Sequence, residues 1–194
     1  MELTETDLDP DPLRQFESWF AAARKAGMRA PEAMALATAT PEGAPSARMV
    51  LLKGIDERGF VFFTSYESRK GGELEANPQA ALLFYWEPLG RQVRVEGRVE
   101  RGSAEESDAY FASRPPGSRA GAAASHQSRP LAVRSELDRA VAALGDDVAR
   151  PEWWGGYRVR PERYEFWQHR ENRLHDRFLY ERDGSAWSIQ RLYP

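Results

Sequence analysis

Residues 92–100 constrain the fold more than any other segment, because apolar and polar side chains alternate along them. Val93, Val95 and Val99 share one side of an extended chain, and the residues that alternate with them are polar. A strand of this kind buries one face and leaves the other polar, as antiparallel sheets allow. The pattern therefore predicts a half-buried strand in an antiparallel sheet.

Short apolar segments bounded by turn residues predict further strands on both sides of this one. The predicted strands are residues 34–40, 47–53, 60–64 and 80–86 before it, and 157–159, 164–167, 178–181 and 187–192 after it. The predicted turns are residues 41–43, 56–59 and the hairpin turn 183–184.

Helix signals separate these groups of strands. Asp11 followed by Pro12 predicts an N-cap and a helix that ends near Gly27. Ser68 predicts a short helix that stops before Pro78. A capping box at 103–106 opens another helix, residues 114–129 are predicted to be a long loop with some helical turns, and a last helix covers about 135–144.

The order of these elements favours one fold class. Strands follow at short intervals, helices are inserted between groups, and no alternating β-α-β-α order occurs. We therefore predict a mainly β, α+β fold: an antiparallel, Greek-key-like barrel decorated by helices, rather than a doubly wound sheet. Residues 1–194 are predicted to form a single domain, with 1–10 as a flexible N-terminal segment. The pair Gly155-Gly156 resembles a hinge, but the strands after it are needed to complete the sheet.

Charge and composition exclude several classes of partner. A formal net charge of −3 and a pI near 5.7 do not give the broad positive surface of a nucleic-acid-binding protein, so an anion site must be local. The chain has no cysteine, which excludes disulfides, thiolate ligands and cysteine nucleophiles. No signal peptide and no apolar segment of roughly 20 residues are found, so we expect a cytoplasmic protein with no membrane partner.

Familiar nucleotide and hydrolase motifs are absent from the sequence. It has no glycine-rich dinucleotide fingerprint, no phosphate loop, no His-Glu-x-x-His and no nucleophile elbow. The histidines, at 126, 169 and 175, are too few and too scattered to predict a metal site.

Cationic side chains stand instead at the ends of predicted strands. Arg48 and Lys53 bracket an apolar strand, and Arg69 with Lys70 follows the next one. Arginine supplies a planar donor fork for phosphate and lysine a point charge, so such pairs can replace a glycine loop. The plainer interpretations are a sheet rim for the first pair and a solvated helix start for the second.

A second group of ionisable residues lies between two apolar strands near the C-terminus. In an extended chain Arg173, His175 and Arg177 emerge on one face, which suits an anionic planar ligand. Gln92 offers an amide to a heteroaromatic ring, and Trp167 offers a platform. Taken singly, these residues also fit an exposed strand position, a core tryptophan and a packed or surface histidine.

Tyr110, Arg114 and Ser118 lie at spacings of four and would form one stripe if a helix continued through them. The sequence Arg114-Pro115-Pro116 argues against that continuation.

Several blocks, in order along the chain, resemble the pyridoxine 5′-phosphate oxidase family. They are residues 48–53, 63–64 with 68–70, 91–93, 110–115, 127–128, 154–156, and 165–167 with 173–178. The resemblance runs from about residue 11 to residue 194. It implies an FMN-binding split β-barrel that works as a homodimer, with the flavin at the subunit interface.

The resemblance also implies roles for individual residues. Those implied to bind FMN are Arg48, Met49, Val50, Leu51, Leu52, Lys53, Phe63, Thr64, Arg69, Lys70, Gln92, Gln127, Ser128, Trp167 and Arg177. Those implied to bind the substrate are Lys53, Tyr110, Arg114, Ser118, Arg173, Leu174 and His175. Arg173 and His175 are the predicted catalytic pair, and no metal is expected.

The implied reaction oxidises the 4′ alcohol of pyridoxine 5′-phosphate or the amine of pyridoxamine 5′-phosphate. A hydride equivalent moves to flavin N5, and dioxygen reoxidises the flavin, giving pyridoxal 5′-phosphate and hydrogen peroxide. Arg177 is implied to stabilise charge on the flavin, and Arg173 to hold the pyridine ring over it.

The chain departs from the family pattern in three places. It starts only about ten residues before Asp11, so we expect it to lack the basic, tyrosine-bearing N-terminal segment of many members. Arg119 replaces a usual glutamine, and residues 122–124 are alanines where the family commonly has tryptophan.

The alternatives to the leading interpretation are an FMN oxidase of secondary metabolism, of the phenazine type, and a non-catalytic protein that binds flavin or pyridoxal phosphate.

Overall fold

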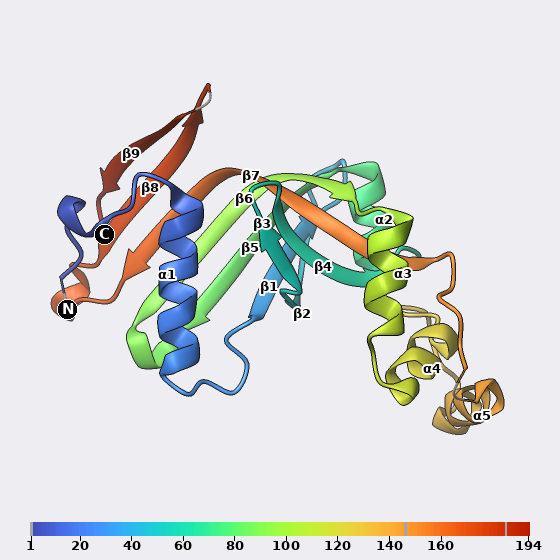
Figure 1. Cartoon of the computed structure of the whole chain (residues 1–194). Coiled ribbons are helices and arrows are strands. Elements are labelled where there is room, and N and C mark those ends of the chain that lie inside the picture. The colour runs from blue at the N-terminus through green and yellow to red at the C-terminus, as the bar shows by residue number, and fades with distance from the viewer. Residues whose placement is uncertain (1, 146, 185) are drawn as a thin grey trace.

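The computed structural model describes residues 2–145, 147–184 and 186–194. Within these ranges nine strands form one antiparallel sheet, which curls into a partial barrel (Figure 1). The predicted antiparallel, helix-decorated fold is therefore confirmed. Positions 1, 146 and 185 lie outside the described residues, and the single domain stays a prediction.

The sheet order is β2-β1-β5-β6-β7-β4-β3, with β8 paired to β7 and β9 to β8. The strands are β1 (Ala33–Ala39), β2 (Pro45–Leu51), β3 (Gly54–Asp56), β4 (Gly59–Ser65), β5 (Gln79–Trp86), β6 (Arg91–Arg101), β7 (Trp154–Gln168), β8 (Asp176–Asp183) and β9 (Ala186–Leu192). The helices are α1 (Pro12–Lys25), α2 (Arg69–Ala76), α3 (Ala104–Ala112), α4 (Pro116–Ala124) and α5 (Arg134–Leu144), with 3-10 turns η1 (Glu5–Asp7), η2 (Glu87–Leu89) and η3 (Glu171–Arg173).

Helix α1 covers one face of the sheet and forms the core with it (Figure 1). The Asp11 side chain accepts a hydrogen bond from the backbone amide of Leu13 at 2.9 Å, which confirms the predicted N-cap. Phe16 is fully buried, and its ring lies 4.9 Å from the rings of both Phe60 and Phe84. The apolar stripe of α1 thus holds the barrel together, and α3, α4 and α5 lie at the far end of the sheet.

The opposite face of the sheet keeps large apolar side chains in solvent. Met49, Leu51 and Tyr85 are 64%, 41% and 55% exposed. Tyr85 is in register with Gln92 on β6, which in turn is opposite Trp167 on β7. This face, which we call the open face, therefore carries the predicted flavin residues Met49, Leu51, Gln92 and Trp167.

Strand β7 joins two segments that the sequence predicted as separate strands. Pro161, between these two segments, lacks an amide donor, which disfavours a continuous central strand. A register shift after Glu96 places Pro161 opposite Gly97, so pairing with β6 continues on both sides. A Cβ on Gly97 would lie 1.9 Å from the carbonyl oxygen of Arg160, so only glycine permits this close approach.

Residues 114–129, predicted to be a loop with some helical turns, contain the nine-residue helix α4. Pro116 starts the helix, and Ala120 is the residue that it buries. A single buried position gives no periodic pattern, which is why the sequence did not predict a full helix. Helix α3 ends at Ala112, so Tyr110 and Ser118 are on different helices.

The N-terminal segment, predicted to be flexible, is anchored in the structure from Leu3 onward. Leu3 is 5% exposed, and its amide donates to Asp176 at 3.0 Å. Arg191 on β9 binds Glu5 at 2.8 Å. The partners of this segment lie more than 170 residues away along the chain, so its local sequence does not reveal the anchoring. Figure 1 shows both chain ends beside β8 and β9.

Candidate functional site

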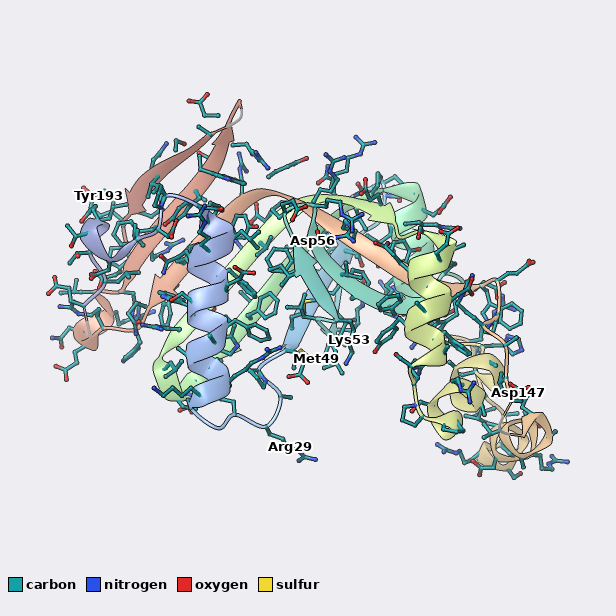
Figure 2. The ribbon with its side chains drawn as sticks, in the orientation of Figure 1. Arg29, Met49, Lys53, Asp56, Asp147 and Tyr193 are labelled. Carbon is teal, nitrogen blue, oxygen red and sulfur yellow. The ribbon has the colours of Figure 1, made fainter. Side chains whose placement is uncertain are left out.

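A cavity of about 700 Å³ lies between β2, β4, the start of α2, and helices α3 and α4. The predicted site residues that line it are Arg48, Met49, Val50, Leu51, Lys53, Phe63, Thr64, Arg69, Lys70, Tyr110, Arg114, Gln127 and Ser128. Figure 2 shows Met49 and Lys53 near one another between α1 and α3. Residues that lie up to 80 positions apart in the sequence, from Arg48 to Ser128, thus share one surface.

Lys70 is the most enclosed cation of this wall, at 7% exposure. The capping side chain of Ser68 starts α2 and places Lys70 in its first turn. The Lys70 Nζ donates to Thr64 at 3.1 Å, to Ser68 at 3.2 Å and to Gln127 at 2.7 Å. Burial, and then the nearby Arg48 guanidinium, lowers the pKa of Lys70 to about 8. The partners are neutral, so the ammonium charge is left for an anion.

Arg48 projects from β2 and is held on both terminal nitrogens. Its Nη1 donates to the carbonyl of Leu36 at 3.2 Å and to Thr38 at 2.5 Å. Its Nη2 donates to the hydroxyl of Ser46 and, at 3.2 Å, to the carboxylate of Glu73. Arg48 is thus a fixed cation beside the cavity. The sequence did not single out Glu73, because a glutamate in a short polar helix predicts a solvated position.

Three stacked aromatic rings form another wall. Phe63 and Tyr110 stack at 4.0 Å, and Trp154 lies 5.6 Å beyond Phe63. The Arg114 guanidinium sits 4.7 Å over Trp154, and its Nη1 is buried with no partner among the described residues. Burial lowers the pKa of Arg114. An arginine held with an unused donor suits an incoming anion or acceptor.

Gly155 and Gly156, which resembled a hinge in the sequence, pair with Thr64 and Phe63 inside the sheet. A Cβ on Gly156 would lie 3.0 Å from the ring of Phe63. The glycines therefore let β7 pass close to the aromatic wall.

A second group of predicted residues lies on the open face and on the loop beside it, away from the cavity: Gln92, Trp167, Arg173, Leu174, His175 and Arg177. Gln92, Trp167 and Arg177 follow one another across β6, β7 and β8. The Arg177 Nε donates to the buried Glu165 at 2.8 Å, and its Nη1 to the carbonyl of Tyr193 at 3.0 Å. The ring of His175 lies 4.5 Å from that of Trp167.

The prediction that Arg173, His175 and Arg177 share one face of an extended chain is wrong. Gln168 pairs with Asp176, so residues 169–175 are the connection between two antiparallel strands and must turn. Residues 171–173 form η3, with Arg173 at φ +64°, and only Arg177 lies on a strand. Leu174 is 66% exposed beside them.

The second group does not line the cavity. Ser118 and Leu52 do not line it either. Ser118 is exposed on α4, and Leu52 is 7% exposed in the core. The residues that line the cavity but had no role assigned from the sequence are Ser46, Ala47, Ser65, Gly121, Ala122, Ser125 and Trp154.

Among the described residues, no three His, Asp or Glu side chains gather as a metal site. In the same part of the chain, no helix has the length and apolarity needed to cross a membrane.

Comparison with protein families matches almost the whole chain. Residues 20–146 match the model described as pyridoxamine 5′-phosphate oxidase. Residues 154–194 match the one described as the pyridoxine 5′-phosphate oxidase C-terminal dimerisation region. The second match contains Trp167, Arg173, His175 and Arg177.

Similar proteins carry consistent names. A pyridoxine/pyridoxamine 5′-phosphate oxidase of Rubrobacter xylanophilus is 63% identical, covering 99% of this chain and 91% of that protein. One of Burkholderia multivorans is 58% identical, covering 99% of this chain and 93% of that protein.

Solved structures agree on the fold. PhzG from Burkholderia lata, in complex with tetrahydrophenazine-1-carboxylic acid, aligns with a TM-score of 0.94 and 38% identity over 100% of this chain and 98% of its own. A pyridoxamine 5′-phosphate oxidase-related, FMN-binding protein of Nostoc punctiforme aligns with a TM-score of 0.80 and 18% identity over 96% of this chain and 100% of its own. The split-barrel fold is thereby confirmed.

Proposed function

The chain belongs to the pyridoxine/pyridoxamine 5′-phosphate oxidase family, and from this premise we propose that it converts pyridoxine 5′-phosphate and pyridoxamine 5′-phosphate to pyridoxal 5′-phosphate. It is an oxidoreductase, and its cofactor is FMN. The observation that carries the proposal is the cation-lined cavity in which the buried Lys70 ammonium is held by neutral partners.

The residues of the cavity fit a phosphorylated flavin. Lys70 and Arg69 offer donors at the start of a helix, where the backbone dipole also favours an anion. Arg48 adds a fixed positive charge, and Thr64 and Gln127 border the same space. FMN, when bound there, supplies the acceptor for a hydride equivalent, and dioxygen takes the electrons onward to hydrogen peroxide.

The protein acts as a homodimer, consistent with the family description of residues 154–194. The open face supports this assembly, because Met49, Leu51 and Tyr85 leave apolar surface in solvent. Met49 both lines the cavity and lies opposite Ala35 in the sheet that carries the open face. We infer that the second group of one protomer closes the cavity of the other, so that each site is built from two chains.

Substrate binding is assigned to donors that the cofactor does not need. Arg114 has an unused buried Nη1, and Tyr110 and Lys53 line the same cavity. These groups suit the substrate phosphate. Arg173 and His175, on the loop between β7 and β8, are then free to orient the pyridine ring.

Arg177 stands apart from the substrate residues in this scheme. The carboxylate of Glu165 fixes its Nε, and the carbonyl of Tyr193 fixes its Nη1. A guanidinium held in this way presents positive charge to the flavin ring without having to reorganise.

One structural observation favours a second candidate function. The α4 side of the cavity is lined by the small residues Gly121 and Ala122, with Ser125 next to them. Such a wall leaves room for a larger ring system, and PhzG, which was solved with a tricyclic compound, has the same fold at 38% identity. The alternative is an FMN oxidase of secondary metabolism that acts on a tricyclic substrate.

A direct assay separates these functions. The purified protein should show the absorption spectrum of bound FMN. It should form aldehyde and consume oxygen when either vitamer phosphate is added under air. Turnover restricted to a dihydro- or tetrahydrophenazine carboxylic acid would favour the second candidate. Bound FMN with no turnover of any of these compounds would indicate a flavin-binding protein.

A further inference from the structure

A buried carboxylate lies directly behind the cationic wall of the cavity. Glu73, on α2, is 6% exposed and does not line the cavity itself. Its Oε2 accepts from the hydroxyls of Thr38 at 2.5 Å and Ser46 at 2.6 Å, and its Oε1 accepts from Arg69 Nε at 2.8 Å. Burial opposes its ionisation, but these hydrogen bonds and that of Arg48 outweigh burial and lower the pKa of Glu73 to about 2.

Glu73 immobilises Arg48 by three routes. One is the direct contact between Arg48 Nη2 and the carboxylate, at 3.2 Å. The other two pass through Thr38 and Ser46, each of which accepts from Arg48 and contacts the same carboxylate oxygen. The four terminal hydrogens of Arg48 are therefore all used within the protein. An anion in the cavity meets its fixed positive charge.

Arg69 is held in a complementary way. Its Nε is bound by Glu73, while its terminal nitrogens have no acceptor among the described residues. The side chain is 62% exposed, so without this anchor it would sample many rotamers. The anchor leaves the terminal nitrogens available beside the cavity.

The Glu73 carboxylate also interacts electrostatically with the Lys70 ammonium. The positive charge of Arg48 lowers the pKa of the ammonium, and the negative charge of Glu73 raises it. The other charged or titratable groups around the cavity are Arg69 on α2 and Lys53, Tyr110 and Arg114 on the facing walls. The described residues that line the cavity include no acid, and Glu73 lies directly behind them.

We propose that Glu73 is a positioning residue of the phosphate site, which fixes Arg48 and Arg69 beside the cavity for the phosphate of FMN. This inference rests on the proposed FMN function and deepens it. An isosteric amide cannot do the same work, because one of its two ends is a donor. If the amide NH2 group faces Arg69, the Arg69 Nε–H loses its acceptor. If it faces Thr38 and Ser46, their hydroxyls lose theirs.

The test is cofactor binding by full-length protein from which the flavin has been removed. The variants are Glu73→Gln, the milder Ser46→Ala, and the control Glu75→Gln on the exposed side of the same helix. Titrations of FMN and of riboflavin, which lacks the phosphate, are followed by flavin fluorescence from pH 6 to pH 9.5. Because one charge-assisted contact is lost, we expect the FMN dissociation constant to rise about tenfold in Glu73→Gln and by less in Ser46→Ala.

Two further results are expected from a role directed at the phosphate. Riboflavin binding should stay unchanged in all variants. The pH at which FMN affinity declines should be lower in Glu73→Gln than in the parent protein, because Lys70 then loses its proton sooner. A purely structural glutamate would weaken both ligands and leave that pH where it was.

Three outcomes would overturn the inference. They are FMN binding that is unchanged or tighter in Glu73→Gln, equal weakening of FMN and riboflavin, and a weakening that Glu75→Gln shares. If the parent protein bound neither FMN nor riboflavin, the proposed function itself would fall, and this inference with it.

Discussion

The amide of Arg170 donates a hydrogen bond to Nδ1 of His175 at 3.1 Å. Because Nδ1 is the acceptor, the neutral imidazole carries its proton on Nε2. The same Arg170 binds Asp176 at 3.3 Å through its guanidinium, so the residues on both sides of the turn are tied together. The loop between β7 and β8 therefore presents His175 as a donor in a fixed orientation.

Replacing His175 tests this tautomer. His175→Gln keeps a donor near the Nε2 position, whereas His175→Asn keeps only an acceptor near Nδ1. Since a hydrogen bond to a charged partner contributes about 1.5–3 kcal/mol, we expect kcat/KM to fall by about 100-fold in the Asn variant and clearly less in the Gln variant. Steady-state oxygen uptake with pyridoxine 5′-phosphate measures both. The reverse order would mean that Nδ1 faces the substrate.

Arg173 is predicted to serve the substrate and not the cofactor. Arg173→Ala should lower kcat/KM for pyridoxamine 5′-phosphate about 100-fold, because a charged donor to the ring is lost, and leave the FMN dissociation constant within about twofold. Arg160→Ala, which removes a 64% exposed arginine on β7, is the matched control. A larger loss of FMN than of substrate turnover would reverse the assigned roles.

Lys70 predicts a pH dependence of cofactor binding. Its pKa of about 8 in the free protein means that the ammonium is present below that pH and is lost as the pH rises through it. FMN affinity should therefore decline above about pH 8, and riboflavin affinity should not. In Lys70→Met the FMN dissociation constant should rise about 100-fold and lose this decline, since one buried charge pair is missing. A decline that persists in the variant would point to another titrating group.

The open face predicts a dimer that a single charge disrupts. Met49→Glu places a carboxylate on a 64% exposed apolar position of this face. We expect light scattering to report a shift to monomer, together with loss of bound FMN, because each site is proposed to be built from two chains. Leu144→Glu, at a 42% exposed position on α5, is the control and should remain dimeric. A dimeric Met49→Glu variant that keeps its flavin would place the interface elsewhere.

Gly97, at the register shift between β6 and β7, should be important for the stability of the fold. An added Cβ would meet the carbonyl oxygen of Arg160 at 1.9 Å, and backbone atoms cannot move aside as side-chain ends do. Gly97→Ala should lower the free energy of unfolding by about 2–3 kcal/mol in urea titration. Gly72→Ala, where nothing lies within 4 Å of the new atom, should cause no loss.

Local patterns predicted the elements that depend on local chemistry. The alternation in β6, the N-cap of α1 and the capping box of α3 are all present in the structure. Each is set by residues that lie close together in the sequence, so the sequence carries the whole signal.

Features that depend on pairing between distant segments were not predictable in this way. The turn at Arg173 follows from the register of β7 with β8, and the burial of Glu73 follows from packing of α2 against β1 and β2. The separation of the site residues into two groups is also a property of the fold. No single stretch of sequence contains it.

The anchoring of Leu3 to Asp176 has a practical consequence. Asp176 directly follows His175, and Arg191 near the other terminus binds the same carboxylate at 3.0 Å. Affinity tags or fluorescent fusions joined at either terminus would sit next to the turn that presents His175. The exposed helix α5, at the far side of the molecule, is the safer attachment point for probes of turnover.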